Sequence, residues 1–365
     1  MKVLFITNIP SPYRLKFFKE LGKWCELDVI FERATSAERD ESWGQFCFEN
    51  YRGILLKGIA FNTDKAFSLE IIKYLKKDYD ILIIANAATP LGVFSIMYLK
   101  MHRRKYYIEG DGAQYIKKNP FKEYIKKKII GGAAGYFSTS EELDHYYRMY
   151  GATSKIYRYP FTSVSMSDIQ DSEKKEQKRY EARKRLNISE KSKIVLGIGR
   201  FDFIKGFDVL IRAMKNMTEA QCYIIGGEPT DEYLQIIEKN SVKNVVFRKF
   251  MTPDKLEVYF QAADIFVLPT RYDPWGLVIN EAMAYGLPVI STTKCVAATE
   301  LIENGKNGYV VRPDDVEELS VKMLELLKNE DLCKKMQTEN IKKISAYTIE
   351  NMVKIHMDVF QNILK

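Results

Sequence analysis

The feature that most constrains the fold is a repeated alternation of short apolar runs and amphipathic stretches. In the second half of the chain, five β-rich runs with Gly or Pro close by are predicted strands: residues 194–199, 222–227, 245–250, 265–269 and 288–292. Amphipathic stretches at 207–217, 254–263 and 278–286 separate them and are predicted helices. Strands and helices that alternate at this spacing form βα units, whose parallel sheet is covered on both faces.

The first half of the chain repeats the same pattern. Its predicted strands are residues 2–7, 27–32, 80–85, 105–109 and 134–140, and its predicted helices are residues 13–23, 66–77, 92–103, 120–130 and 140–150. A chain of 365 residues is long enough for two domains of about 150 residues each. The sequence therefore predicts an α/β protein with two Rossmann-like, doubly wound parallel-sheet domains.

The domain boundary is predicted from a highly charged stretch. We expect a first domain over residues 1–166 and a second over 167–347, with residues 167–180 as the linker and a solvated helix behind it. Residues 348–365 form an amphipathic helix with one apolar face, made of Met352, Ile355, Val359 and Ile363. Two placements stay open for this helix: it closes the core of the second domain, or it crosses back to the first.

Composition bears on the compartment and the partners. The five cysteines are scattered without a CxxC pair, which argues against a disulfide framework or a structural zinc site. The first apolar run is short and soon interrupted by Pro10 and Pro12, so we interpret it as a buried strand instead of a secretion signal. We expect a cytoplasmic protein. Residues 1–170 hold 26 Lys and Arg against 19 Asp and Glu, so most of the net charge of +8 lies in the first half.

Two carboxylates flank a turn in the most informative segment of the chain. Asp273 precedes Pro274, Trp275 and Gly276, and Glu281 lies one turn into the next predicted helix. Glycine permits close approach of the backbone to a ligand, and the free amides of a helix start attract phosphate. The two acids could therefore hold the two ends of one ligand by its hydroxyl groups, with a diphosphate between them. The alternative is an ordinary βα turn with solvated acids.

Two cations lie in the loop after the strand at 194–199. Arg200 and Lys205 come after Gly199, at the carboxyl end of a strand, where open α/β sheets bind ligands. Two positive charges there can neutralise a leaving diphosphate. The alternative is that both are surface charges.

Several motifs succeed one another in a fixed order: GIGR (197–200), KGFDVLIRAM (205–214), IIGG (224–227), ADIFVLPT (263–270) and DPWGLVINEAMAYGLPVI (273–290). With ENGKNGYVVRPDDVEELS (303–320), they resemble the retaining glycosyltransferases of family 4, of the two-domain GT-B type, over residues 194–327. The form is similar to a branch that assembles bacterial capsules and surface polysaccharides. The resemblance implies two domains that face a central cleft, and a nucleotide-diphosphate sugar as donor.

The resemblance also implies roles for single residues. Arg200 and Lys205 match the cations that hold the donor diphosphate, and Glu281 matches the acid that binds the ribose. Asp273 stands where the family usually has Glu, near the hydroxyls of the donor sugar, and is one methylene shorter. The residues that the resemblance places at the donor are Gly199, Arg200, Lys205, Gly227, Arg248, Phe250, Met251, Asp273, Trp275, Gly276, Leu277, Val278 and Glu281.

The first half departs from the family pattern. The loop after the first strand, residues 8–14, contains no Gly, and the region where many members carry a His reads YYIEGDGAQ (106–114). Glu109 and Asp111 are thus candidates for shaping the reaction centre. Alternatively, this region is a turn at Asp111-Gly112 or a hydrogen-bonded loop. GT-B enzymes resemble one another in working without a metal, so we predict neither a metal nor a cofactor.

The implied function is transfer of a sugar from a nucleotide donor to a glycan or lipid-linked saccharide. The basic segment 117–130 interleaves Lys with apolar residues, which is typical of a helix that lies on anionic lipid, or of a solvated helix whose stripe faces the core. Three rival functions remain: a sugar-nucleotide epimerase, a nicotinamide dehydrogenase and a nucleic-acid-binding protein. No G-x-G-x-x-G comes after the first strand and no nucleic-acid module stands out, which disfavours the last two.

Overall fold

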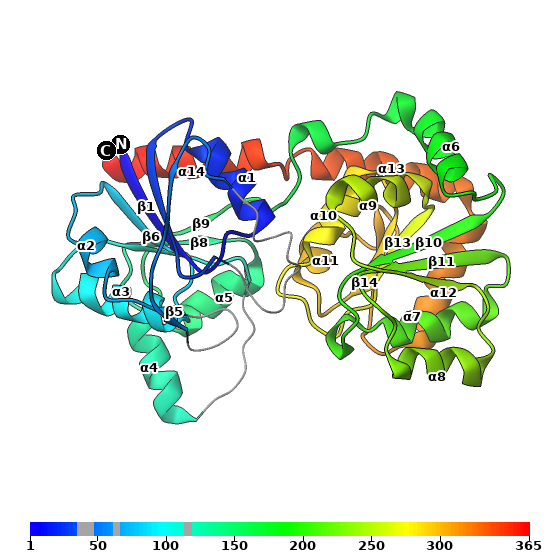
Figure 1. Cartoon of the computed structure of the whole chain (residues 1–365), viewed down its shortest axis with the longest axis horizontal. Helices are drawn as coiled ribbons and strands as arrows, with labels where there is room; N and C mark the ends of the chain where they lie inside the picture. Colours follow the sequence, from blue (N-terminus) through cyan, green and yellow to red (C-terminus); the bar gives the residue numbers. More distant parts are fainter. Residues whose placement is uncertain (35–46, 61–65, 113–118) are drawn as a thin grey trace. The chain divides into compact units, whose positions relative to one another are not determined.

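In the computed structural model, residues 1–34, 47–60, 66–112 and 119–365 are described. The chain forms two compact units (Figure 1): unit 1 contains Met1–Ser163 and Thr348–Lys365, and unit 2 contains Val164–Tyr347. The boundary at residue 163 lies close to the predicted one at 166. Residues 167–180, which the sequence predicts as a linker at the start of the second domain, lie within unit 2.

The sheet of unit 1 is parallel throughout, and in the described residues its strand order is β3-β2-β1-β6-β7-β8-β9. The strands are β1 Lys2–Thr7, β2 Glu26–Phe31, β3 Arg52–Leu55, β6 Ile81–Ile84, β7 Tyr107–Glu109, β8 Gly135–Ser138 and β9 Ile156–Arg158. A separate antiparallel pair joins β4 (Ile59–Ala60) to β5 (Ala66–Phe67). β1 and β6 are buried past Lys2 and almost entirely apolar, as the central strands of a covered parallel sheet must be.

Helices lie on both faces of this sheet (Figure 1). They are α1 Pro12–Leu21, α2 Ile71–Leu75, α3 Pro90–Met101, α4 Pro120–Ile130 and α5 Glu141–Met149, with α14 at Ile349–Leu364. Thr89 and Asn119 cap α3 and α4 by accepting a hydrogen bond from the third residue of each helix, and a Pro occupies the first position of both. The predicted helix over 66–77 is wrong in its first part, because Ala66 and Phe67 pair with Ile59 and Ala60 as a strand.

The last helix closes unit 1. The chain returns to this unit at Thr348, and α14 packs against α1. Its buried residues lie along one face of the helix: Ile349, Met352, Val353, His356, Val359 and Phe360. The alternative that this helix closes the second domain is therefore wrong.

Unit 2 has the strand order β12-β11-β10-β13-β14-β15, again with parallel neighbours. The strands are β10 Lys193–Ile198, β11 Ala220–Ile225, β12 Val245–Arg248, β13 Ile265–Leu268, β14 Val289–Thr292 and β15 Gly308–Val311. In order of sequence this arrangement is 3-2-1-4-5-6, the order of the Rossmann fold. The predicted fold class, two doubly wound parallel-sheet domains, is confirmed.

The helices of unit 2 form a layer on each side of its sheet (Figure 1). One layer contains α7 Phe207–Ala213, α8 Asp231–Asn240 and α12 Val316–Lys328, and the other contains α9 Pro253–Ala262, α10 Leu277–Ala284 and α13 Glu330–Ile344. α6 Lys175–Arg185 packs on α9, and α11 Val296–Leu301 comes after β14. The predicted helix over 207–217 ends early, as α7 gives way to a 3-10 turn at Met214–Asn216.

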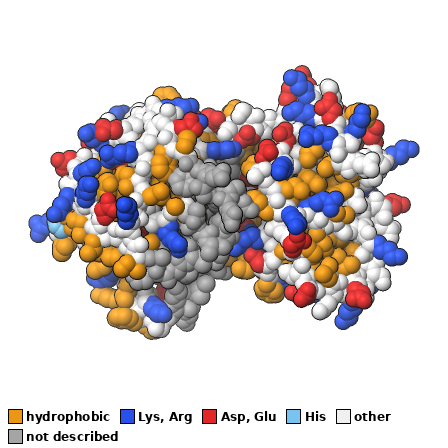
Figure 2. Space-filling model, in the orientation of Figure 1, with side chains coloured by type: hydrophobic (Ala, Val, Ile, Leu, Met, Phe, Trp, Pro, Cys, Tyr) orange, Lys and Arg blue, Asp and Glu red, His pale blue; other side chains and the backbone are white. Residues whose placement is uncertain are grey.

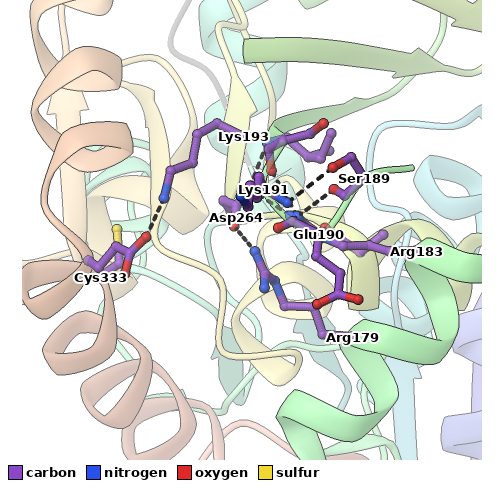
Figure 3. Close-up of polar contacts among 12 residues, drawn as sticks. Arg179, Arg183, Ser189, Glu190, Lys191, Lys193, Asp264 and Cys333 are labelled. Atoms are coloured by element: carbon purple, nitrogen blue, oxygen red, sulfur yellow. Dashed lines mark hydrogen bonds and ion pairs between the residues drawn. The ribbon is translucent and has the colours of Figure 1, made fainter. Parts of the chain in front are cut away.

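One buried arginine ties α6 to the amino edge of the sheet. The guanidinium of Arg183 is 1% exposed and donates to Asp264 Oδ2 at 2.9 Å, while Arg179 donates to Asp264 Oδ1 at 2.6 Å (Figure 3). Arg183 also donates to the backbone carbonyls of Ala262, Ser189, Glu190 and Ser192. α6 is therefore an integral part of unit 2, although the sequence predicted a solvated helix.

Replacing Arg183 by Met should destabilise unit 2 by about 3–5 kcal/mol, because the change leaves Asp264 and several carbonyls without their buried donor. Urea unfolding followed by circular dichroism measures the loss. Arg185→Met, on the exposed face of the same helix, is the matched control and should leave the midpoint in place. Equal midpoints for the two variants would contradict the role given to Arg183.

Candidate functional site

The site in unit 2 begins where the connections of β10 and β13 diverge. β10 and β13 are neighbours in the sheet, but the chain leaves them toward opposite sides, and the carboxyl ends of such strands are where open α/β sheets bind ligands. Lys205 comes from the 3-10 turn after β10 and Asp273 from the loop after β13. Their side chains form an ion pair with 2.5 Å between Lys205 Nζ and Asp273 Oδ2. The structure thus brings together two predicted residues that are 68 positions apart.

Close backbone contacts fix the loop that carries Lys205. Asp202 caps the turn by accepting from the amide of Lys205 at 3.0 Å. Gly206 has φ of 68°, and a Cβ there would lie 2.1 Å from the carbonyl oxygen of Pro269 at the end of β13. Only glycine allows this approach without displacing the strand end. The loop after β10 is consequently packed on the loop that carries Asp273.

The turn before α10 is fixed by contacts with buried residues. Gly276 has φ of 95°, and a Cβ there would lie 2.6 Å from Cys295 Sγ. Trp275 is only 2% exposed, and its indole N–H donates to Asn280 Oδ1 at 2.8 Å. The carbonyl of Trp275 accepts from Cys295 and Ala297. We therefore assign the Trp275 side chain a supporting role, in place of the predicted ligand contact.

The start of α10 presents its first amides beside the two acids. Leu277 and Val278 are the first residues of the helix and partly exposed, and first-turn amides have no acceptor within a helix. Glu281 is also partly exposed, one turn further along. Asp273 is buried, and its second oxygen accepts from the amide of Trp275 at 3.2 Å. This arrangement is suited to an anion at the helix start with hydroxyl groups on either side.

The remaining predicted residues lie at the ends of β10, β11 and β12. Arg200 comes after β10 and its side chain is about half exposed. Its Nε lies 3.4 Å from Asp202 Oδ2. Gly199 packs closely against the loop after β11. A Cβ on Gly226, in that loop, would lie only 2.0 Å from the Gly199 carbonyl oxygen. The amide of Gly227 donates to the carbonyl of Arg248 at 3.3 Å.

At the end of β12, the Arg248 guanidinium contacts Tyr259; just beyond the strand, Phe250 is exposed and Met251 is partly exposed. Arg248, Phe250 and Met251 lie close together in sequence at the end of an edge strand. Their exposure leaves them accessible to a planar ligand such as a nucleotide base.

Sequence reasoning missed a buried ion pair that supports this edge. Arg271, two residues before Asp273, forms two parallel hydrogen bonds with Asp208 of α7, at 2.8 and 2.9 Å. Burial raises the pKa of Asp208, but the hydrogen bonds and charges of Arg271 and Arg212 together outweigh burial and hold that pKa below its usual value. The signal in the sequence was a carboxylate on the apolar face of a predicted helix, which needs a buried cation.

In unit 1, Glu109 is a buried structural residue. Its side chain is 0% exposed, and its two oxygens face Arg14 of α1 and His356 of α14. Burial alone would raise the pKa of Glu109, but the charge of Arg14 and the contact with His356 lower it to about 2. A carboxylate enclosed in this way is not a direct ligand contact, and the part of Glu109 in shaping the reaction centre stays a prediction.

Asp111 is the accessible acid of this region. Its side chain is 43% exposed and its Oδ2 accepts from the Tyr13 hydroxyl at 3.2 Å. Asp111 lies on the wall of a cavity of about 360 Å³ at the carboxyl ends of β6 and β7, bounded by α3, α4 and α5. The cavity is lined with apolar side chains such as Val93 and Ile125, and Lys122 and Lys126 also line it. It is suited to an anionic ligand with an apolar part.

α4 presents apolar side chains outward. Phe121, Tyr124 and Ile125 are 71%, 59% and 40% exposed, and Ile130 is the buried residue of the helix. The alternative that the whole stripe faces the core is therefore wrong for the described part of the segment, which excludes residues 117 and 118. Among the described residues, no helix is long and apolar enough to cross a membrane, and no group of three or more His, Cys, Asp or Glu could hold a metal.

Comparison with known protein families finds a match in the second half of the chain. Residues 178–343 match the sequence profile of the family described as glycosyl transferases group 1. These residues are therefore similar to the glycosyl transferases group 1 family, and we refer to them as the group 1 segment. The group 1 segment includes Arg200, Lys205, Asp273 and Glu281, and the match confirms the resemblance drawn from residues 194–327.

Two relatives illustrate the range of similarity. An uncharacterized glycosyltransferase of Methanocaldococcus jannaschii is 32% identical over 143 residues, which are 38% of this chain and 36% of that protein. The first curated relatives are matched over only about a third to two fifths of their length. The O-antigen chain mannosyltransferase C of Escherichia coli is 21% identical, over 100% of this chain and 99% of its own.

A solved structure extends the likeness to both units. The Anabaena protein HepE, crystallised in complex with UDP, superposes with a TM-score of 0.77 over 100% of this chain and 99% of its own. Sequence identity is 16%, so this likeness shows the fold alone. The fold of the group 1 segment and that of unit 1 thus occur together in another protein.

The buried Glu109 makes the stability of unit 1 depend on pH. A carboxyl whose pKa falls from 4.5 to about 2 on folding stabilises the protein above pH 4.5 and loses that contribution as the pH falls toward 2. Glu109→Gln should destabilise by about 3–5 kcal/mol at pH 7, because Arg14 loses its buried ion pair and keeps only the longer contact with the partly exposed Asp111.

Urea unfolding of the wild type and Glu109→Gln at a series of pH values measures this effect. The difference between their free energies of unfolding should narrow below pH 4.5. The exposed Glu142→Gln is the control and should match the wild type at every pH. If the difference in free energy of unfolding stays constant from pH 7 down to the pH at which Glu109 becomes protonated, Glu109 does not have the lowered pKa assigned to it.

Proposed function

We propose that this protein is a retaining glycosyltransferase that moves a sugar from a nucleotide-diphosphate sugar to a glycan or lipid-linked saccharide, in the synthesis of a cell-surface polysaccharide. The observation that carries the proposal is the grouping of Lys205, Asp273 and the start of α10 at the switch point of the unit 2 sheet. The group 1 profile covers this whole grouping. The UDP complex of HepE and the mannosyltransferase name of the Escherichia coli relative support the donor and the polysaccharide product.

Each group at this site has a task in holding the donor. Arg200, Lys205 and the first amides of α10 bind the diphosphate, because positive charge and free N–H groups favour an anion there. Glu281 accepts hydrogen bonds from the ribose, and Asp273 accepts from the sugar. The short Asp273 side chain is compensated by its loop, which Gly206 and Gly276 hold close to the strand ends.

The chemistry uses these contacts. In a retaining transfer, the acceptor hydroxyl attacks the anomeric carbon from the face that the diphosphate leaves. The bond from carbon to the diphosphate oxygen breaks, the bond to the acceptor oxygen forms, and the departing phosphate takes the proton of the hydroxyl. Arg200 and Lys205 stabilise the charge that builds on the leaving group, so this scheme assigns no step to a metal or cofactor.

The cavity of unit 1 is the proposed acceptor site. Lys122 and Lys126 offer positive charge to a phosphate, and the apolar wall offers a surface to a hydrocarbon chain. Asp111 lies on the same wall and can accept a hydrogen bond from a sugar hydroxyl. These features together favour a saccharide linked to a lipid by phosphate.

Substitution of the cations tests the donor site. Arg200→Ala and Lys205→Ala should each lower turnover by about 10²–10³, judging by the loss of one donor from other preorganised sites. Transfer of radiolabelled sugar, with UDP-glucose, UDP-galactose and GDP-mannose as donors, gives the rates, and thermal shift with the same panel gives binding. Lys215→Ala, exposed in the turn after α7, is the control. Near-wild-type rates for both variants at saturating donor would show that the site is misplaced.

We also propose that the protein is cytoplasmic and meets its acceptor at an anionic membrane surface through residues 117–130. Figure 2 shows hydrophobic side chains, with Lys and Arg near them, on the part of unit 1 that carries α3 and α4. Phe121 and Tyr124 of α4, with Met97 and Met101 of α3, are each more than half exposed, and the lysines of α4 are beside them. Exposed aromatic and apolar groups next to lysines are typical of helices that dock on anionic lipid.

Sedimentation with liposomes tests this docking. The wild type should bind vesicles that contain phosphatidylglycerol more strongly than vesicles of phosphatidylcholine alone, because each Lys near an anionic surface contributes about 1 kcal/mol. Phe121→Ser with Tyr124→Ser should weaken the binding without altering thermal stability, since both side chains are exposed. Val321→Ser, an exposed apolar residue of unit 2, is the control. Equally negligible binding to both kinds of vesicle would remove the idea.

A further inference from the structure

A polar cluster in the core of unit 1 joins three segments that are far apart in the sequence. Arg14 comes from α1, Glu109 from the end of β7 and His356 from α14, and their side chains are 3%, 0% and 0% exposed. Arg14 Nη1 donates to Glu109 Oε1, and His356 Nε2 lies 3.3 Å from Glu109 Oε2. His356 Nδ1 lies 2.7 Å from the carbonyl oxygen of Met352. Both ring nitrogens therefore face oxygen acceptors.

Aromatic rings enclose the histidine. The imidazole stacks on Phe137, with ring centroids 4.9 Å apart and planes 4° from parallel. Phe17 and Tyr159 approach it from other sides, at 4.9 and 4.8 Å. The ring is enclosed, so any effect of His356 on a reaction must pass through its neighbours, of which Glu109 is its side-chain hydrogen-bond partner.

The cluster leads to the wall of the cavity. Arg14 Nη2 lies 3.7 Å from Asp111 Oδ2, and the Tyr13 hydroxyl donates to the same oxygen. The Tyr159 hydroxyl, whose ring contacts His356, donates to the carbonyl of Gly110 at 3.0 Å. The backbone before Asp111 and its carboxylate are thus both held by groups that contact the cluster.

We propose that His356 is a positioning residue for the acceptor: through Glu109 and Arg14 it fixes the carboxylate of Asp111, which binds an acceptor hydroxyl. This inference rests on the proposed function, because it needs an acceptor in the cavity of unit 1. The proposal gives α14 a role in the reaction in addition to closing the core of unit 1. Arg14 of α1 is one partner of Glu109, and His356 of α14 is the other.

A purely structural histidine would have different consequences. A loss of overall stability would lower donor binding and transfer to the acceptor together, whereas loss of Asp111 positioning acts on the acceptor alone and is not additive with Asp111→Asn. The donor residues lie in unit 2 and the cluster lies in unit 1. Donor affinity is therefore the internal reference for each variant.

The test is a double-mutant cycle between His356→Phe and Asp111→Asn. The assay is transfer from the best donor of the panel to N-acetylglucosamine linked to farnesyl diphosphate, and calorimetry with the free nucleoside diphosphate gives donor affinity. His356→Phe should lower acceptor kcat/KM about tenfold in the wild-type background and have little further effect with Asp111→Asn, because coupled residues are not additive. Donor affinity should stay within about twofold. His356→Gln, which restores a polar contact to Glu109, should recover part of the loss.

Lys354→Gln, on the exposed face of α14, is the control for the helix and should behave as the wild type. Unchanged acceptor kinetics in His356→Phe, or full additivity with Asp111→Asn, would overturn this inference while leaving the proposed function in place. Absence of transfer by the wild type would overturn both. If His356→Phe does not fold, His356→Gln replaces it in the same cycle and is judged by the same non-additivity.

Discussion

The site in unit 2 depends on the order of the strands in its sheet. β10 and β13 are neighbours, yet the chain passes from one to the other only after building β11 and β12 on the far side. Their loops therefore leave the same edge in opposite directions, and Lys205 and Asp273 meet there as an ion pair. An antiparallel pair would have sent its two loops to opposite edges of the sheet, so parallel pairing is the condition for the site.

Close backbone contacts then hold the loops at this edge. Gly206 lies against the carbonyl of Pro269, Gly226 against that of Gly199, and Gly276 against Cys295. A side chain at any of these positions would push two loops apart. Packing of backbone on backbone keeps the cation, the acid and the helix start within one small region, which is what preorganised binding of an anion requires.

Unit 1 has a similar strand order but holds its loops with buried charge. The loop after β1 contains no glycine, and Arg14 in the first turn of α1 pairs with Glu109 at the end of β7. A charge pair of this kind needs all of its partners, and α14 supplies His356. The two units thus fix the loops at the carboxyl ends of their strands by different means: unit 2 uses close glycine contacts, and unit 1 uses a buried polar cluster.

The sequence by itself determined the alternation of strands and helices, the fold class, and the candidate residues of the site in unit 2. This information is local: periodicity reports which face of an element is buried, and motif spacing places Arg200, Lys205, Asp273 and Glu281 at strand ends. The tertiary structure decided that Glu109 is buried while Asp111 is accessible, that Trp275 supports its turn from inside, and that α14 closes unit 1. Each of these depends on a partner far away in the sequence or on the packing of a whole unit, such as Arg14 and His356 for Glu109. No local pattern records such a partner, because burial of a charge is stable only when the fold supplies the opposite charge.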